Sequence, residues 1–494
     1  MSRRVVSAFL LVAALLASST TAARAGAGAV EPLTWRGCRD GFECATLDVP
    51  VDYAVPQGEQ VGMSLIRRQA VNPDARIGSL VVNYGGPGDP GTDSLRVAYQ
   101  SLPAEIRERF DIVSFDPRGT GRSRPIDCVD DATFDRAWSE DVTPDSQSEL
   151  PAYYDGTVFS VDLVGACIDR HGEWLTHVGT RNVARDLDRL RAALGDPKLT
   201  YLGFSYGTTL GAVYAQEFPS NVRALVLDSA VNLSTSPEQN QRGNVRGFED
   251  AIETFVTTCE SDPDCPFYSN GHPREGLFRL RDEFEDGLVL DTLDGRTVGV
   301  TEFYVAMLAA LYSEQGRNDL GQALRDAEED RDGTYLRLFN DGYAGRAPNG
   351  TYNNLHEAIG VIRCADQPVE RVSFSEFRAK FIDFIKRFPV FGRAFAGSPL
   401  GCDPRLPTPR KEEQLGHVRA TDAPPVLIVG VTRDPATPYA GALDLQRRLR
   451  GSRVLTLDST QHGGYLSGVA CIDTAVDRYL VQRKMPPRGA RCEL

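Results

Sequence analysis

The sequence predicts an α/β fold in which helices flank a mostly parallel central sheet and a mainly helical cap is inserted before the last two strands. Two observations predict it. From residue 79 onward, short β-branched runs alternate with segments of helical periodicity, as in parallel strands joined by crossover helices. Sheet-like runs resume near residue 421, after a long stretch at 232–420 that is rich in charged helical segments. These observations favour a cap inserted into one sheet domain over a separate downstream domain.

The expected elements follow one another as strand and then helix. The stretch 78–88, GSLVVNYGGPG, is predicted to be a buried strand that ends in a glycine-rich loop. Apolar residues recur at helical spacing from Val183 to Leu194, and Gly195 is a good C-terminal cap, so a helix is predicted there. A second helix is predicted over about 207–218. Further strands are expected within 110–123, 198–205, 222–230, 424–434 and 453–464, and a second irregular insertion at about 122 to 180.

Four segments result: a signal peptide at 1–25, the first part of the sheet domain at 26–231, the cap at 232–420 and the second part of the sheet domain at 421–494. The signal is predicted from basic Arg3 and Arg4, an apolar run and the A-x-A site that ends at Ala25. No later apolar stretch reaches the roughly 18 residues that a membrane span needs. We therefore expect a secreted, extracellular protein without a stable membrane anchor, exported by the general or the twin-arginine route.

The cysteines indicate disulfides. All ten lie after the predicted signal, and an even number fits an oxidising compartment. We predict pairing between nearest neighbours in chain order, because Cys38 with Cys44 and Cys259 with Cys265 would close short loops. The ten are Cys38, Cys44, Cys128, Cys167, Cys259, Cys265, Cys364, Cys402, Cys471 and Cys492.

Several classes of ligand are disfavoured. No C-x-x-C occurs and the six histidines show no H-x-x-x-H spacing, which gives little support for a metal centre. The nucleotide-binding patterns G-x-G-x-x-G and G-x-x-x-x-G-K-[ST] are absent as well. A net charge of −14 argues against a nucleic-acid partner, although a cationic substrate is compatible with it. We expect no metal, no cofactor, no nucleic-acid partner and a monomer.

One short motif carries a candidate nucleophile. The pentapeptide from Gly203 to Gly207 fits G-x-S-x-G and stands after a predicted strand and before a predicted helix. In a nucleophile elbow that turn is tight and strained, so the flanking positions must be glycine-sized and the serine hydroxyl projects above the sheet. The helix directs its N-terminal N–H groups and positive dipole end toward the serine. Ser205 is therefore the predicted nucleophile.

A serine hydroxyl needs a histidine base, and the histidine needs a carboxylate that holds its tautomer. His462 is the candidate base because it lies just past a predicted strand, in a loop that contains glycine. Asp434 directly follows the preceding strand and is the candidate orienting acid. The chain order Ser205, Asp434, His462 agrees with only one of the three common orders of serine triads. A surface histidine is the alternative for His462 taken alone.

Other acidic residues have weaker claims. Asp228, at the end of the strand after the elbow, is an alternative triad acid. Asp116 and Arg118 are expected to form a turn that braces the loops. Asp366 lies beside a cysteine in the cap, where it is either structural or faces the substrate.

The tetrahedral intermediate of acyl transfer needs two preorganised N–H donors for its oxyanion. One is predicted to be the backbone N–H of Tyr206, next to the nucleophile. The other is predicted in the glycine-rich loop, where Gly85 and Gly86 permit a close approach of the backbone. A phosphate cradle is the alternative for this loop, but no nucleotide motif supports it.

These stretches resemble a known family. GGPG before FDPRGTGRS, GFSYGTTLGAVYAQEFP, GVTRDPATPYAGA and STQHGGY are similar to the secreted actinobacterial tripeptidyl aminopeptidases, relatives of the proline iminopeptidase branch of the α/β-hydrolase superfamily. The likeness covers nearly the whole chain after the signal. It implies the α/β-hydrolase fold with a cap, Ser205, Asp434 and His462 as the triad of a serine peptidase, and release of short peptides from substrates with a free N-terminus. The chain departs from the branch at Tyr84, where histidine is common, and at Asp89-Pro90, which replaces a small-residue run.

Two rival functions share the same residues. A secreted carboxylesterase or lipase would use the same triad, although a lipid substrate favours a cap rich in exposed apolar residues and this one is rich in Asp, Glu and Arg. An inactive scaffold used for binding is disfavoured, because such scaffolds tend to lose a triad member and all three candidates are present.

Overall fold

The computed structural model describes residues 32–144, 146–397 and 400–493. The predicted signal peptide lies outside the described residues. Within them, no helix is both long and apolar enough to cross a membrane.

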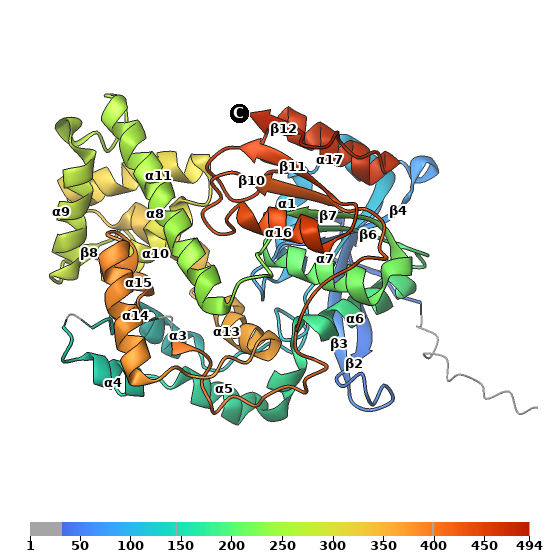
Figure 1. The fold of residues 1–494 in the computed structure, drawn as a ribbon, viewed down its shortest axis with the longest axis horizontal. Coiled ribbons are helices and arrows are strands. Elements are labelled where there is room, and N and C mark those ends of the chain that lie inside the picture. Colours follow the sequence, from blue (N-terminus) through green and yellow to red (C-terminus); the bar gives the residue numbers. More distant parts are fainter. Residues whose placement is uncertain (1–31, 145, 398–399, 494) are drawn as a thin grey trace, which may run out of the picture. The chain divides into compact units, whose positions relative to one another are not determined.

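A mixed sheet organises the fold (Figure 1). Its strand order is β1-β2-β3-β5-β4-β6-β7-β10-β11-β12; the pairs from β5 to β12 are parallel and those from β1 to β5 are antiparallel. The strands are β1 (Arg36–Gly37), β2 (Glu43–Pro50), β3 (Gln60–Arg68), β4 (Gly78–Asn83), β5 (Phe110–Phe115), β6 (Leu199–Phe204), β7 (Val222–Asp228), β10 (Leu427–Val431), β11 (Arg453–Asp458) and β12 (Arg491–Glu493). Each strand expected from the sequence is present, and the α/β-hydrolase fold class is confirmed.

Helices cover both faces of the sheet. Leu80, Val82 and their alternate neighbours pack with apolar side chains of the helices on one face, and the intervening residues, among them Val81 and Tyr201, point to the other face. Helices α1 (Gly91–Ala98), α2 (Ala104–Arg109) and α17 (Ala470–Gln482) contact the strands on the first face; α6 (Thr180–Ala193), α7 (Tyr206–Glu217) and α16 (Ala440–Arg448) lie on the second. Two of these, α6 and α7, are the helices that the sequence predicts.

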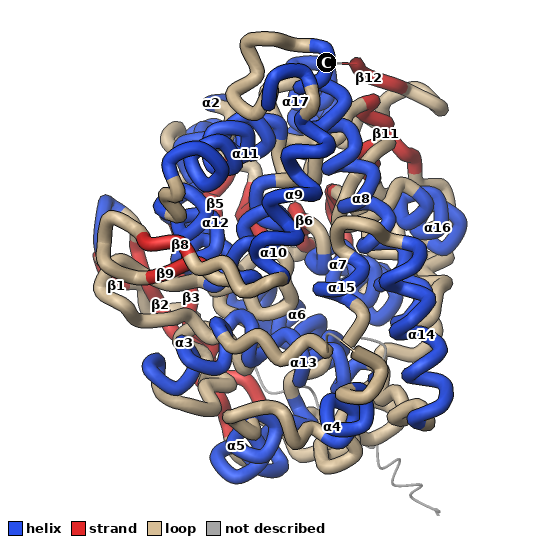
Figure 2. Tube along the Cα trace, turned by 90° about the vertical axis from the view of Figure 1, so that its left-hand side faces the viewer, coloured by secondary structure: helices blue, strands red, loops and turns tan. Residues whose placement is uncertain are grey.

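A helical region separates β7 from β10 and has its own hydrophobic core, in which Phe248, Phe303 and Phe377 are buried. Figure 2 shows its helices in front of the sheet strands. They are α8 (Pro237–Ser261), α9 (Pro273–Glu285), α10 (Val300–Ala310), α11 (Glu314–Arg325), a π-helical turn (Asp326–Asp330), α12 (Thr334–Ala344), α13 (Leu355–Asp366), α14 (Phe374–Arg387) and α15 (Gly392–Phe395), with a small hairpin of β8 (Leu290–Asp291) and β9 (Thr297–Val298). We call this region the cap.

The second insertion packs against the cap. Its helices are α3 (Asp131–Ser139), α4 (Leu150–Asp155), α5 (Leu163–His171) and a 3₁₀ segment (Gly172–His177). Leu150 is buried in the cap core, and Trp138 donates a hydrogen bond to Asn340 Oδ1 at 3.0 Å. Two separate stretches of sequence, the second insertion and the cap, therefore pack against each other.

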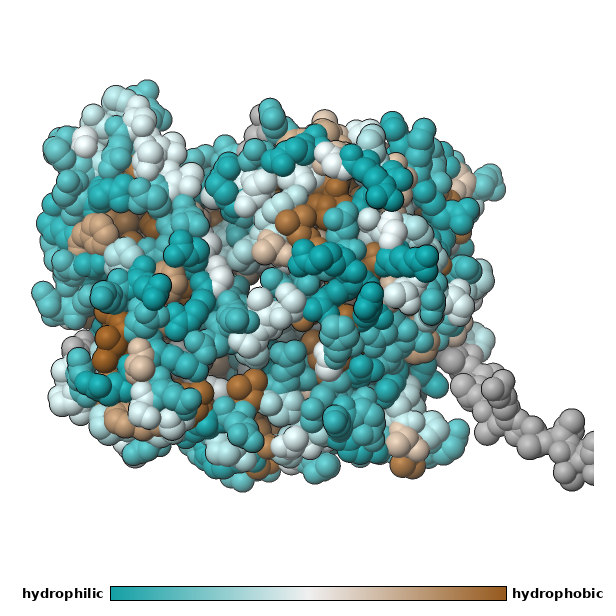
Figure 3. Space-filling model, viewed as in Figure 1, coloured by the Kyte–Doolittle hydropathy of each residue, from teal (hydrophilic) through white to brown (hydrophobic). Residues whose placement is uncertain are grey.

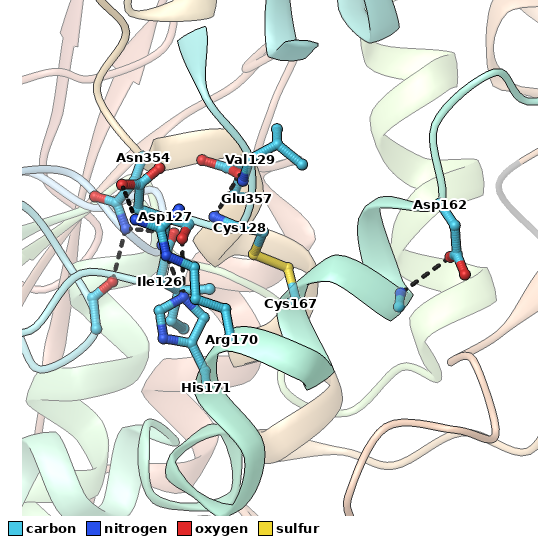
Figure 4. Close-up of a disulfide and its surroundings, with 12 residues drawn as sticks. Ile126, Asp127, Cys128, Val129, Asp162, Cys167, Arg170, His171, Asn354 and Glu357 are labelled. Carbon is cyan, nitrogen blue, oxygen red and sulfur yellow. Dashed lines mark hydrogen bonds and ion pairs between the residues drawn. A yellow bond between two sulfur atoms is a disulfide. The ribbon is translucent and has the colours of Figure 1, made fainter.

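All five disulfides join nearest neighbours in chain order: Cys38–Cys44, Cys128–Cys167, Cys259–Cys265, Cys364–Cys402 and Cys471–Cys492. The predicted pairing is confirmed. Cys128–Cys167 links α5 to the loop after β5 (Figure 4). Cys471–Cys492 links α17 to β12. Three strands therefore follow the cap, not the two that the sequence predicts.

Candidate active site

Ser205 occupies a sharp turn between β6 and α7. Its φ of 54° and ψ of −122° lie in a region that residues other than glycine rarely adopt. The backbone N–H of Ser205 donates to the carbonyl oxygen of Asp228 at 2.9 Å, which ties the turn to the end of β7. The half-buried side chain therefore stands at the carboxyl ends of the parallel strands, where this fold places its nucleophile.

The glycines on either side of this turn are sterically required. A Cβ on Gly203 would lie 2.5 Å from the carbonyl oxygen of Gly207, and a Cβ on Gly207 would lie 2.7 Å from Asn83 Oδ1. Real Cβ atoms essentially never approach this closely. The G-x-S-x-G spacing thus has a direct cause in the packing of β6, α7 and the end of β4.

His462 and Asp434 form a hydrogen-bonded pair at the ends of β11 and β10. His462 Nδ1 lies 2.9 Å from Asp434 Oδ1 and 3.1 Å from Oδ2. Asp434 is buried and also accepts from the N–H groups of Ala436 and Thr437, at 3.0 and 2.8 Å. Burial acts to lower the pKa of His462, but the charge and hydrogen bond of Asp434, helped by the charge of Asp228, hold that pKa above its ordinary value.

The end of β7 brings the serine turn and the histidine loop together. The carboxylate of Asp228, fully buried, accepts from the N–H groups of Gly464 at 3.0 Å and Tyr465 at 2.7 Å, while its carbonyl oxygen holds Ser205. Burial raises the pKa of this carboxyl to about 6. Within the described part of the chain, no hydrogen bond joins the Ser205 hydroxyl to His462. Such contacts commonly tighten only when substrate is bound.

The structure thus separates the two candidate acids. Asp434 contacts the imidazole ring directly, whereas the side chain of Asp228 binds the backbone of the loop that follows His462. Sequence reasoning considered Asp228 only as an alternative triad acid. The sequence could not show that Asp228 anchors this loop, because its partners Gly464 and Tyr465 lie more than two hundred residues further along the chain.

The glycine-rich loop after β4 lies directly against the elbow. Gly85 has a φ of +107°, and a Cβ there would lie 3.0 Å from Ser205 Cβ and 3.3 Å from Tyr206 N. The N–H of Gly85 donates to Asn83 Oδ1 at 3.2 Å. Among the described residues, no acceptor is found for the N–H groups of Gly86 and Tyr206. Of the three predicted donors, Gly85 is already engaged with Asn83, and the N–H groups of Gly86 and Tyr206 remain the candidate oxyanion donors.

The cap contributes a contact that the sequence did not predict. Tyr312, between α10 and α11, accepts from the N–H of His462 through its carbonyl oxygen at 2.8 Å. Its ring meets the imidazole edge-to-face, with ring centroids 5.2 Å apart. The cap thus contacts the candidate base through both the backbone and the ring of Tyr312, and no motif in the sequence marks this tyrosine.

Among the described residues, no hydrogen bond joins the remaining candidates to Ser205, Asp434 or His462. Asp116 accepts from the N–H groups of Thr92 and Arg122, both at 2.9 Å, so it braces the loop as expected. Arg118 is buried and binds both carboxylate oxygens of Asp186 at 2.6 and 2.7 Å. Asp366, the last residue of α13, is buried, and burial raises its pKa to about 6.

A strand-serine-helix elbow, a histidine–carboxylate pair after the later strands and two free N–H donors define a serine hydrolase of the α/β-hydrolase type. Comparison agrees: residues 78–469 match the family described as alpha/beta hydrolase fold, and the chain belongs to that family.

Curated relatives match over most of their length. "Serine protease Hip1" of Mycobacterium tuberculosis is 38% identical, over 94% of this chain and 91% of that protein. "Carboxylesterase B" of the same species is 33% identical over 94% and 91%. "Tripeptidyl aminopeptidase" of Streptomyces lividans is 30% identical over 96% and 88%. The resemblance first seen in the short motifs therefore extends along the chain.

Proposed function

We propose that this serine hydrolase is a secreted exopeptidase that cleaves near the free N-terminus of peptides and releases short peptides. The observation that carries the proposal is the Ser205 elbow beside the hydrogen-bonded His462–Asp434 pair. The likeness to a tripeptidyl aminopeptidase and to a serine protease supports a peptide rather than another acyl compound as substrate. Five disulfides support the extracellular location, together with the predicted signal.

The proposed mechanism assigns one role to each side chain. His462 takes the proton of the Ser205 hydroxyl while the serine oxygen attacks the peptide carbonyl, and Asp434 holds the imidazole in the required tautomer. The oxyanion that forms on the carbonyl oxygen accepts from the N–H groups of Gly86 and Tyr206. His462 then protonates the leaving amine, an acyl-enzyme remains on Ser205, and a water molecule activated by His462 releases the acid.

The free N-terminus is the feature that separates this proposal from endopeptidase or esterase action. An ammonium group is best recognised by carboxylates held at a fixed distance from the nucleophile. The net charge of −14 is compatible with a cationic group on the substrate. The length of the released peptide would follow from that distance.

The test compares chromogenic peptides of one to four residues with free and with acetylated N-termini, alongside a short-chain p-nitrophenyl ester. We expect faster cleavage of the free-amine peptides, with one length preferred. Equal cleavage of blocked peptides would overturn the exopeptidase proposal. Ser205→Ala should abolish turnover, and Ser220→Ala, an exposed serine just after α7, is the matched control that should retain it. Turnover left in Ser205→Ala would mean that another residue is the nucleophile.

A carboxylesterase is the second candidate, because one relative that is 33% identical carries that name. The residues described above would serve ester hydrolysis equally well. The face of the molecule in Figure 3 is largely hydrophilic, with apolar side chains in small separate patches, which favours a soluble over a lipid substrate. Turnover of the ester with no cleavage of any free-amine peptide would favour this second candidate.

A further inference from the structure

Helix α13 of the cap touches the supports of both free oxyanion donors. We propose that α13 positions these donors, with Asp366 and Thr180 as positioning residues that act on Tyr206. This inference rests on the acyl-transfer chemistry proposed above. It assigns to the cap, which contains none of the three triad residues, a role in positioning the oxyanion donors.

At the C-terminal end of α13, a chain of hydrogen bonds leads to Tyr206. Thr180 donates its N–H to Asp366 Oδ1 at 2.6 Å and its hydroxyl to Oδ2 at 2.5 Å. The Tyr206 hydroxyl is hydrogen-bonded to the same Thr180 oxygen. A threonine hydroxyl has one hydrogen, which Thr180 gives to Asp366, so Tyr206 must be the donor to Thr180. The hydrogen bonds therefore run in one direction, from Tyr206 to Thr180 and from Thr180 to Asp366.

This chain acts on the oxyanion donor because of where Tyr206 lies. Tyr206 is the first residue of α7, and its N–H is one of the two free donors. Its side chain is anchored through Thr180, which is fully buried, to a carboxylate that is 6% exposed. The side-chain anchor and the donor N–H belong to one residue, so a change in the anchor tilts the N–H away from the oxyanion.

At its N-terminal end, α13 lies over the glycine-rich loop that holds the second donor. A Cβ on Gly86 would lie 3.2 Å from Leu355 Cδ1, and a Cβ on Gly88 would lie 3.2 Å from Ala358 Cβ. The first turn of α13 thus packs against the loop at Gly86 and Gly88, and the elbow packs against it at Gly85.

Helix α13 can position the donors only if it is itself held in place, and several contacts hold it. Asn354, just before α13, accepts from the N–H of Gly121 at 2.9 Å and donates to the carbonyl oxygens of Gly119 and Ile126 at 2.8 and 3.0 Å. Glu357 accepts from the N–H of Cys128 at 2.8 Å, beside the Cys128–Cys167 disulfide (Figure 4). The Cys364–Cys402 disulfide fixes the last turn.

A purely structural anchor is the rival explanation, and kinetics separates the two. Tyr206→Phe and Thr180→Val each break the link while leaving the N–H of residue 206 in place. Complete loss of one oxyanion donor costs about 10²–10³ in kcat, so a displaced donor is expected to lower kcat by about tenfold with KM changed less than about twofold. Asp366→Asn, which keeps one acceptor oxygen, is expected to lose less.

The control lies on the same pair of helices. Tyr214 of α7 donates its hydroxyl to Asp188 of α6 at 2.9 Å, so Tyr214→Phe also removes a hydroxyl–carboxylate link between α7 and α6, but away from the donors. We expect it to keep wild-type kcat. Thr180→Ser keeps the hydroxyl and should restore most of the activity that Thr180→Val loses.

The measurement is kcat and KM of each variant for the p-nitrophenyl ester. The concentration of active sites, titrated with a fluorophosphonate, is used to calculate kcat. The melting temperature of each variant is measured alongside. The ester reports acyl transfer whatever the peptide preference, so failure of the exopeptidase proposal leaves this test intact. Tyr206→Phe and Thr180→Val should not add in the double variant, because they break one link. Wild-type kcat per site in both single variants, or a loss that Tyr214→Phe shares, would overturn the proposal.

Discussion

Replacing Asp228 with asparagine is expected to stabilise the folded protein above about pH 6. The carboxyl is fully buried, and burial raises its pKa to about 6 from an ordinary value of 3.8. A rise of about two pKa units corresponds to roughly 3 kcal/mol that the buried charge costs the folded state at neutral pH. Asparagine has the shape of the protonated carboxyl and keeps an oxygen that can accept from Gly464 and Tyr465, so the variant avoids that cost.

The sign of the pH dependence follows from the direction of the pKa change. Because the folded-state pKa lies above the unfolded one, the wild-type protein has its full stability from this group below pH 3.8 and loses it as the pH rises through about 6. Asparagine does not titrate. The free energies of unfolding should therefore agree near pH 4 and differ by up to about 3 kcal/mol near pH 8. Urea unfolding followed by tryptophan fluorescence, with the disulfides kept oxidised, measures this difference.

Asp228→Ala is the control for the hydrogen bonds. It leaves two buried N–H groups without an acceptor at every pH, so it should destabilise the protein by about 1–3 kcal/mol for each group. The opposite result refutes the reasoning: Asp228→Asn is less stable than wild type, and the deficit is larger near pH 8 than near pH 4. The charge of Asp228 would then be stabilising. Because Asp228 helps to raise the pKa of His462, its neutralisation should also shift the acid limb of kcat/KM to lower pH.

Three further predictions concern other residues. Asp434→Asn should lower kcat by about 10⁴ in the ester assay with an unchanged melting temperature, because an amide does not hold His462 in the required tautomer; a loss below tenfold would contradict this. Gly207→Ala should lower the free energy of unfolding in urea by about 1–3 kcal/mol, since its Cβ would lie 2.7 Å from Asn83 Oδ1. Unchanged stability would show that the Asn83 side chain moves to make room. Cys128→Ser combined with Cys167→Ser opens a loop with a separation of 39 residues, so the free energy of unfolding in urea without reductant should fall by up to about 4 kcal/mol; an unchanged free energy of unfolding would contradict this.

The candidate site could be predicted from the sequence because its residues lie in short segments at the ends of buried strands. The apolar strands at 199–204 and 427–431 are followed at once by Ser205 and by the loop that contains Asp434, so strand prediction and motif position agree. Disulfide pairing was predictable because each cysteine bonds within its own segment.

Contacts across the cap could not be predicted in the same way. Tyr312 contacts His462, which lies 150 residues further along the chain. The link from Asp366 to Tyr206 depends on how α13 packs against α6, which contains Thr180. Neither has a local pattern. The antiparallel strands β2 and β3 were also missed, although Val61, Met63 and Leu65 alternate with less buried residues, a period of two that marks such a strand.

The chain-order pairing of the disulfides has a consequence for how the molecule would come apart. No disulfide connects the segment that ends with β7 to the segment that begins with β10. The two halves of the sheet are joined across that boundary by strand pairing and by the polypeptide through the cap. A single proteolytic nick between residues 266 and 363 would yield two fragments that stay associated in native buffer and separate in denaturant without any reducing agent.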